Sequence, residues 1–87
     1  MKFETLHLCN IEQLNNINQY IQLISKNDAV IFYSEKISTS EYEKLNKLIL
    51  KNPIYFVITQ NINKLKTISY DEWLYLVNNY QKTFTWK

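Results

Sequence analysis

The sequence predicts a small α/β domain with a mostly parallel sheet and helices on both faces. Two unbroken apolar runs, residues 29–33 and 54–58, are bounded by polar residues and are rich in Val, Ile, Phe and Tyr. Strands buried on both faces typically have such continuous runs, and these residue types favour strands. Segments with helical spacing flank the runs, which predicts parallel strands joined by helical crossovers. A chain of 87 residues is expected to form a single domain, residues 1–87.

A strand and a helix are predicted ahead of the central strand at 29–33. Residues 3–8 alternate well enough for a first strand, and Asn10 is placed to cap a helix over residues 11–24. The apolar residues of this helix recur on one face: Leu14, Ile17, Ile21 and Ile24. These segments therefore predict a strand–helix–strand unit.

A second helix is expected between the two apolar runs. Ser38 with Glu41, or Ser40 with Glu43, provides its capping signal. Pro53 ends the region, because the residue before a proline is pushed out of helical geometry. The predicted buried face consists of Tyr42, Leu45, Leu48 and Ile49.

The last part of the chain predicts a short strand, a third helix and an edge strand. Residues 65–68 are interpreted as a short fourth strand. Ser69 and Glu72 then form the clearest capping box in the sequence. The apolar arc of the third helix comprises Trp73, Leu74, Leu76, Val77 and Tyr80. Residues 83–86 alternate and are expected to add a strand at the edge of the sheet.

The composition excludes several classes of function. Because the chain has no glycine, neither a Walker loop nor a dinucleotide-binding fingerprint can form. The net charge is only +2 and no basic residue is an arginine, which argues against a reader of nucleic acid sequence. The single cysteine suits a reducing compartment, and no apolar run approaches ~18 residues. We therefore expect a cytoplasmic, soluble protein.

Cys9 is the one residue that suggests covalent chemistry. It follows the predicted first strand and precedes a helix, where a thiol pKa is lowered and where α/β folds place their sites. The alternative is a small buried hydrophobe, the commoner role of a lone cysteine. His7 lies two residues earlier and shares a strand face with Cys9. The spacing of the residues gives no basis for a Ser-His-Asp set, and no cluster of His, Cys and carboxylates has metal-ligand spacing, so no catalytic residue, cofactor or metal is assigned.

The aromatic residues are more numerous than a thin core must hide. The chain has seven Tyr, four Phe and two Trp, and interfaces concentrate such residues. Three of them, Trp73, Phe84 and Trp86, are predicted to contribute to a subunit interface. We expect Trp86 to anchor the chain end at or beside a subunit boundary, because chain ends fray unless something holds them.

Several segments, taken in order, resemble a known family. They are Thr5-Leu6-His7, residues 25–30, 52–57 and 68–77, and the late Trp86. This order is similar to that of the TusB, or DsrH-like, sulfur relay proteins over nearly the whole chain. The resemblance implies a DsrE-like α/β fold with a parallel sheet. One departure is the connection at 60–66, which is shorter than in the family and lacks an Ala-Arg-Gly segment.

The resemblance also implies a function. Such proteins assemble with TusC-like and TusD-like subunits into a complex of two heterotrimers, which passes persulfide sulfur to a downstream carrier for 2-thiolation of the tRNA wobble uridine. The sulfur-bearing cysteine belongs to the TusD subunit, so a non-catalytic role is expected here. Two alternatives stay open: a sulfurtransferase that carries persulfide on Cys9, and a generic oligomeric α/β scaffold.

Overall fold

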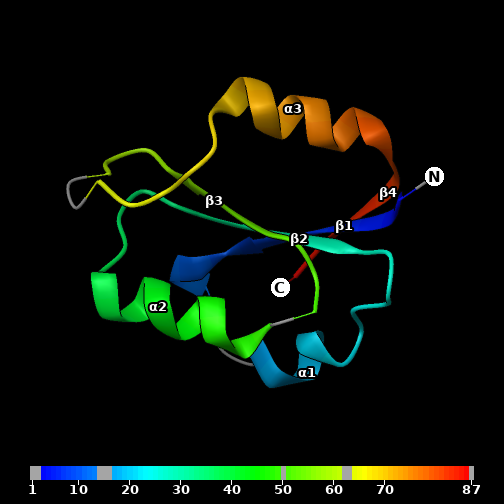
Figure 1. The fold of residues 1–87 in the computed structure, drawn as a ribbon, viewed down its shortest axis with the longest axis horizontal. Coiled ribbons are helices and arrows are strands. Elements are labelled where there is room, and N and C mark those ends of the chain that lie inside the picture. Colours follow the sequence, from blue (N-terminus) through cyan, green and yellow to red (C-terminus); the bar gives the residue numbers. More distant parts are fainter. Residues whose placement is uncertain (1–2, 14–16, 50, 62–63, 87) are drawn as a thin grey trace.

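A four-stranded parallel sheet forms the centre of the molecule (Figure 1). The computed structural model describes residues 3–13, 17–49, 51–61 and 64–86. The strands are β1 (Phe3–Asn10), β2 (Ala29–Ser34), β3 (Ile54–Ile58) and β4 (Tyr80–Thr85), in the order β3-β2-β1-β4. The helices are α1 (Ile17–Ile21), α2 (Thr39–Leu48) and α3 (Tyr70–Asn79), with a 3₁₀ turn at Ile11–Gln13.

The helices cover both faces of the sheet, which confirms the predicted fold class. Figure 1 shows α1 and α2 on one side and α3 on the other. Alternate residues of β2 supply the two cores, because successive side chains of a strand point to opposite faces. Val30 and Phe32 belong to the cluster under α1 and α2, and Ala29 and Ile31 to the cluster under α3. All four side chains are fully buried, as a central strand requires.

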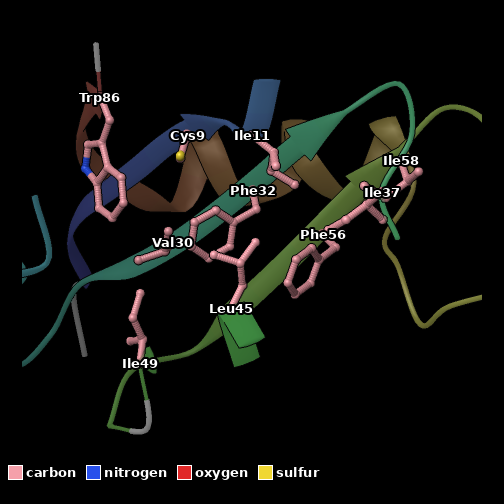
Figure 2. Close-up of a cluster of buried hydrophobic side chains, with 10 residues drawn as sticks. All are labelled: Cys9, Ile11, Val30, Phe32, Ile37, Leu45, Ile49, Phe56, Ile58 and Trp86. Carbon is pink, nitrogen blue, oxygen red and sulfur yellow. The ribbon is translucent and has the colours of Figure 1, made fainter. Parts of the chain in front are cut away.

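The cluster under α1 and α2 is the larger of the two cores. Figure 2 shows its buried side chains, which come from β1, β2, β3, α2 and the residues that follow β4. Its members are Cys9, Ile11, Val30, Phe32, Ile37, Leu45, Ile49, Phe56, Ile58 and Trp86. The cluster under α3 contains Leu6, Ala29, Ile31, Val57 and Tyr80 as its buried members. The sheet is therefore packed more deeply on one face than on the other.

In the described part of the predicted helix over 11–24, the helical structure ends at Ile21 rather than at Ile24. It begins as a 3₁₀ turn, which Asn10 caps by accepting the Glu12 N–H on Oδ1 at 3.0 Å. α1 then ends at Ile21, where the N–H of Ile24 bonds the carbonyl of Ile21 in a tight turn. Three predicted core positions, Ile17, Ile21 and Ile24, pack against the larger cluster, and Leu14 lies outside the described residues.

Both helices form where they were predicted, but two residues assigned to the apolar arc of the third helix differ: Tyr80 begins β4, and Leu74 is 61% exposed. Ser38, rather than Ser40, caps α2 by accepting the Glu41 N–H at 3.2 Å. Leu45 and Ile49 are buried as predicted and Tyr42 is half-buried, but Leu48 is 37% exposed because it lies at the side of the buried stripe. The complete capping box predicted at the start of α3 is present. Within the described residues, no helix is long and apolar enough to span a bilayer.

The predicted strand at 65–68 is wrong. The side chain of Asn61 donates to the Leu65 carbonyl at 2.8 Å and accepts the Leu65 N–H at 2.9 Å, so it takes the place of a neighbouring strand. Lys64 turns the chain with a φ of 52°, and only the Ile68 N–H reaches β3, at the Phe56 carbonyl. The segment is a loop laid along the outer side of β3.

Candidate functional site: β1 and the exposed β4 strand

A buried hydrogen-bond chain joins β1 to the residue that follows β4. The Trp86 Nε1–H donates to His7 Nδ1 at 3.0 Å, and His7 Nε2 lies 2.9 Å from Asp28 Oδ2. An indole nitrogen can only donate, so Nδ1 of His7 must be an acceptor. The ring proton is therefore on Nε2 and is donated to Asp28, which makes this imidazole neutral. Sequence reasoning missed this arrangement, although Asp28 directly before a buried strand was a signal for it.

Asp28 holds the other end of this chain. Its carboxylate also accepts the Thr5 N–H at 3.1 Å and the Ser25 N–H at 2.8 Å, so one side chain fastens the turn before β2 to β1. Burial acts to raise the pKa of this carboxyl. The hydrogen bonds from Ser25, His7 and Thr5 outweigh burial and hold the Asp28 pKa below its ordinary value. Asp28 is thus a buried, ionised acceptor.

Trp86 lies in the core of its own chain. Only 4% of it is exposed; its ring stacks on Tyr20 at 5.3 Å and meets the edge of Phe32 at 6.1 Å. Its backbone N–H continues the sheet by donating to the Leu8 carbonyl at 2.8 Å. The sequence predicted this side chain at or beside a subunit boundary, whereas the contacts described here are intramolecular. A Trp with a buried acceptor for its N–H satisfies both its apolar ring and its polar group.

Cys9 has the properties of a packing residue. The thiol is 1% exposed among Val30, Phe32 and Trp86, as Figure 2 shows, and burial raises its pKa to about 12. It shares a face of β1 with His7, as predicted, but both ring nitrogens of His7 are engaged by other residues. The thiolate is the nucleophilic form, and this environment suppresses it. Among the residues placed by the structure, no group of His, Cys and carboxylates could hold a metal.

β4 is exposed along nearly its whole length. Tyr80 is buried at its start, but residues 81–85 are all exposed, including Phe84 at 42%. Phe84 touches only the edges of the core, through His7 at 5.8 Å and Tyr20 at 6.5 Å. Parallel sheets are normally buried on both faces, so an exposed strand of this kind is unusual. Of the three aromatic residues predicted at an interface, Phe84 is the one that this surface presents.

α3 also leaves apolar surface uncovered. None of its residues is fully buried, although Trp73 is half-buried against Tyr33 at 5.2 Å. A shallow hollow of about 370 Å³ lies between this helix and β3, lined by Tyr55, Ile68, Asp71, Glu72, Tyr75 and Leu76. The other side of the helix carries Tyr70 and Leu74, each 61% exposed. Tyr75, on the side of the hollow, is 68% exposed, so α3 presents apolar side chains on both of its sides.

Comparison of the sequence with family models, with curated proteins and with solved structures gave no significant match.

Proposed function

We propose that this chain is a non-catalytic subunit of a TusB-like sulfur-transfer complex in the cytoplasm. In that role it assembles with TusC-like and TusD-like subunits and supports 2-thiolation of the tRNA wobble uridine. The order of its sequence segments is similar to that of the family. The parallel α/β sheet is also the architecture that the resemblance implied.

The single observation that carries the non-catalytic role is the state of Cys9. A cysteine that carries persulfide must be exposed, because the other carrier has to reach its sulfur. It must also ionise to the thiolate at neutral pH, because the thiolate is the reactive form. Cys9 is 1% exposed, and its pKa is raised to about 12 by burial. The only cysteine of the chain is therefore unsuited to carry sulfur, which favours a structural subunit over a sulfurtransferase.

The exposed strand β4 supports the role of a subunit. A sheet edge with Phe84 on it and little cover over either face is the kind of surface that a partner protein buries. The cores use Phe32, Phe56, Trp86 and Tyr80 as their buried aromatic residues. The surplus of aromatic residues in the composition thus divides between the core and the uncovered surface.

The test combines a Cys9→Ala variant with partner capture in the native cell. We expect tagged wild-type chain to retain two other small subunits, and cells with Cys9→Ala to keep their level of 2-thiouridine at the wobble position. Cells that lack the chain should lose that modification. The matched chemical control is alkylation of Cys9, which should be slow in the native protein and fast after denaturation.

Two results would contradict this proposal. Loss of 2-thiouridine in a normally folded Cys9→Ala variant would restore the sulfurtransferase alternative. Unchanged 2-thiouridine in cells without the chain would remove the link to sulfur transfer altogether and leave an α/β scaffold of another pathway.

A further inference from the structure

The outer side of β4 carries a regular row of backbone groups that face away from the sheet. The Trp86 N–H donates to the Leu8 carbonyl, so the backbone groups of Trp86 face β1. This bond determines which residues of β4 face β1 and which face outward. Because hydrogen-bonding directions alternate along a strand in a parallel pair, residues 82 and 84 also face β1. Gln81, Thr83 and Thr85 therefore direct their N–H and C=O groups outward. No described strand pairs with that side.

This edge lacks most devices that keep exposed edges from pairing. Natural edge strands are blunted by proline, bulges, covering segments or charges. Residues 80–85 contain no proline and include one charged residue, Lys82. Tyr80 and residues 82–85 pair with β1 at one constant offset. The strand thus offers a free template for another strand.

We propose that β4 pairs antiparallel with β4 of a second copy of this chain, about a two-fold axis through Thr83. This inference goes beyond the proposed function and does not depend on it. A symmetric pair places Thr83 opposite Thr83 of the second copy, and Gln81 opposite Thr85 of the second copy. All three outward-facing residues then bond on both their N–H and C=O groups, which gives a continuous sheet across the two copies.

The charges and side chains of β4 favour this register over its neighbours. Centring the axis on Thr83 uses every outward group, whereas an axis through Lys82 or Phe84 leaves part of the row unpaired. An axis through Lys82 would also place two like charges opposite each other, which is destabilising. In the proposed register Lys82 lies opposite Phe84 of the second copy, on the same sheet face. An ammonium beside an aromatic ring is a favourable pair.

The first test compares Thr83→Pro with Thr83→Ala by sedimentation. Proline removes an outward N–H and leaves the bonds to β1 intact, whereas alanine keeps the N–H. We expect a measurable dimer of the wild-type chain at about 0.1 mM. Thr83→Ala should keep the dimer and Thr83→Pro should weaken it by about 10-fold or more, since two central hydrogen bonds are lost. The melting curve of each variant checks that it is folded.

A second pair of variants keeps the test decisive if Thr83→Pro fails to fold. Phe84→Lys and Phe84→Glu remove the same ring contacts but place opposite charges beside Lys82 of the second copy. We expect the dimer of Phe84→Lys to be weaker than that of Phe84→Glu by about 10-fold at low salt, with the difference shrinking at high salt. Equal dissociation constants would contradict the proposed register.

Cysteine cross-linking tests the axis directly. Only Thr83 faces its own symmetry mate, so Thr83→Cys should form a disulfide between copies and Thr85→Cys alone should not. The native Cys9 is buried in both variants and serves as a shared background. A wild-type chain that stays monomeric up to about 1 mM, or equal cross-linking of the two variants, would overturn the proposal. A monomer would assign this edge to a strand of a different protein.

Discussion

The two edges of the sheet differ in what covers them. On β3, three consecutive residues are buried, Phe56, Val57 and Ile58, and the loop at 64–68 runs along the outer side. That loop is fixed at Ile68 by the Phe56 carbonyl and at Lys66 by the Tyr42 hydroxyl. On β4, residues 81–85 are exposed and no described strand pairs with the outer side. Two edge strands of one sheet can therefore differ in burial, because a connecting loop covers the outer side of one and not of the other.

β4 is nevertheless firmly attached, at its two ends. Tyr80 is buried under α3 at the start of the strand, and Trp86 is buried under α1 just beyond its end. Between these anchors the strand contributes backbone bonds to β1 and little side-chain burial. β3 is stabilised by buried side chains within the strand, whereas β4 is stabilised by buried residues at its two ends. The same substitution should therefore change the stability of the fold very differently in the two strands.

The largest expected difference is between Phe56→Asp and Phe84→Asp. Phe56 is 3% exposed, and an unpaired charge in its place costs several kcal/mol, on the order of the stability of the whole domain. Phe84 is 42% exposed, so a carboxylate there stays hydrated. We expect Phe56→Asp to be insoluble or unfolded and Phe84→Asp to give a cooperative melting curve. Cooperative folding of both variants would mean that β3 is no more protected than β4.

Trp86→Phe tests the anchor at the far end of β4. The substitution keeps most of the ring but removes the N–H that His7 Nδ1 accepts, and a buried acceptor without a partner costs about 1–3 kcal/mol. Trp73→Phe is the matched control, because Trp73 is only half-buried and no hydrogen bond from its ring is part of this network. Chemical denaturation should show the larger loss for Trp86→Phe. Equal losses of unfolding free energy in the two variants would mean that Trp86 contributes only apolar packing.

The acid dependence of stability tests the same network from its other end. The folded-state pKa of Asp28 lies below the ordinary value, so its carboxylate stabilises the fold above about pH 4. That contribution is lost as the pH falls through the lower, folded-state pKa. We expect the melting temperature to fall in this range, and to fall less steeply in Asp28→Asn. Asp71→Asn, which changes an exposed carboxyl on α3, is the control and should follow the wild-type profile.

The smallest expected effect concerns the cap of α3, which follows the loop that closes β3. Ser69→Ala removes a complete capping box and should cost about 1 kcal/mol, or ~4–8 °C in melting temperature. Ser38→Ala removes the single cap bond of α2 and should cost no more. An unchanged melting temperature in Ser69→Ala would show that the cap does not stabilise α3.

Local patterns predicted the fold well, but they could not predict the buried polar chain. The apolar runs identified β2 and β3 because burial on both faces leaves few choices of residue. The caps at Ser38 and Ser69 depend on residues three positions apart, within reach of a sequence pattern. The bond between Trp86 and His7 spans 79 positions and follows from the pairing of β4 with β1. Nothing local in the sequence specifies that pairing.

The predicted strand at 65–68 was wrong for a different reason. A short segment with half-buried Leu65 and Ile68 is compatible with a strand and with a loop that lies against the sheet. The outcome was decided by Asn61, whose amide bonds both backbone groups of Leu65 and leaves no place for a neighbouring strand. A side chain that competes for backbone groups in this way is a known function of Asn in turns.

The position of β1 between β2 and β4 has a consequence for folding during synthesis. β1 is made first, but one of its two neighbours is made last, so its outer side stays open until residues 80–86 leave the ribosome. The buried His7 lacks its indole donor over the same interval. Pairing of such distant segments slows folding, and transiently open strands are prone to aggregate. The nascent chain therefore completes this sheet only after β4, the last of its four strands in sequence, has left the ribosome.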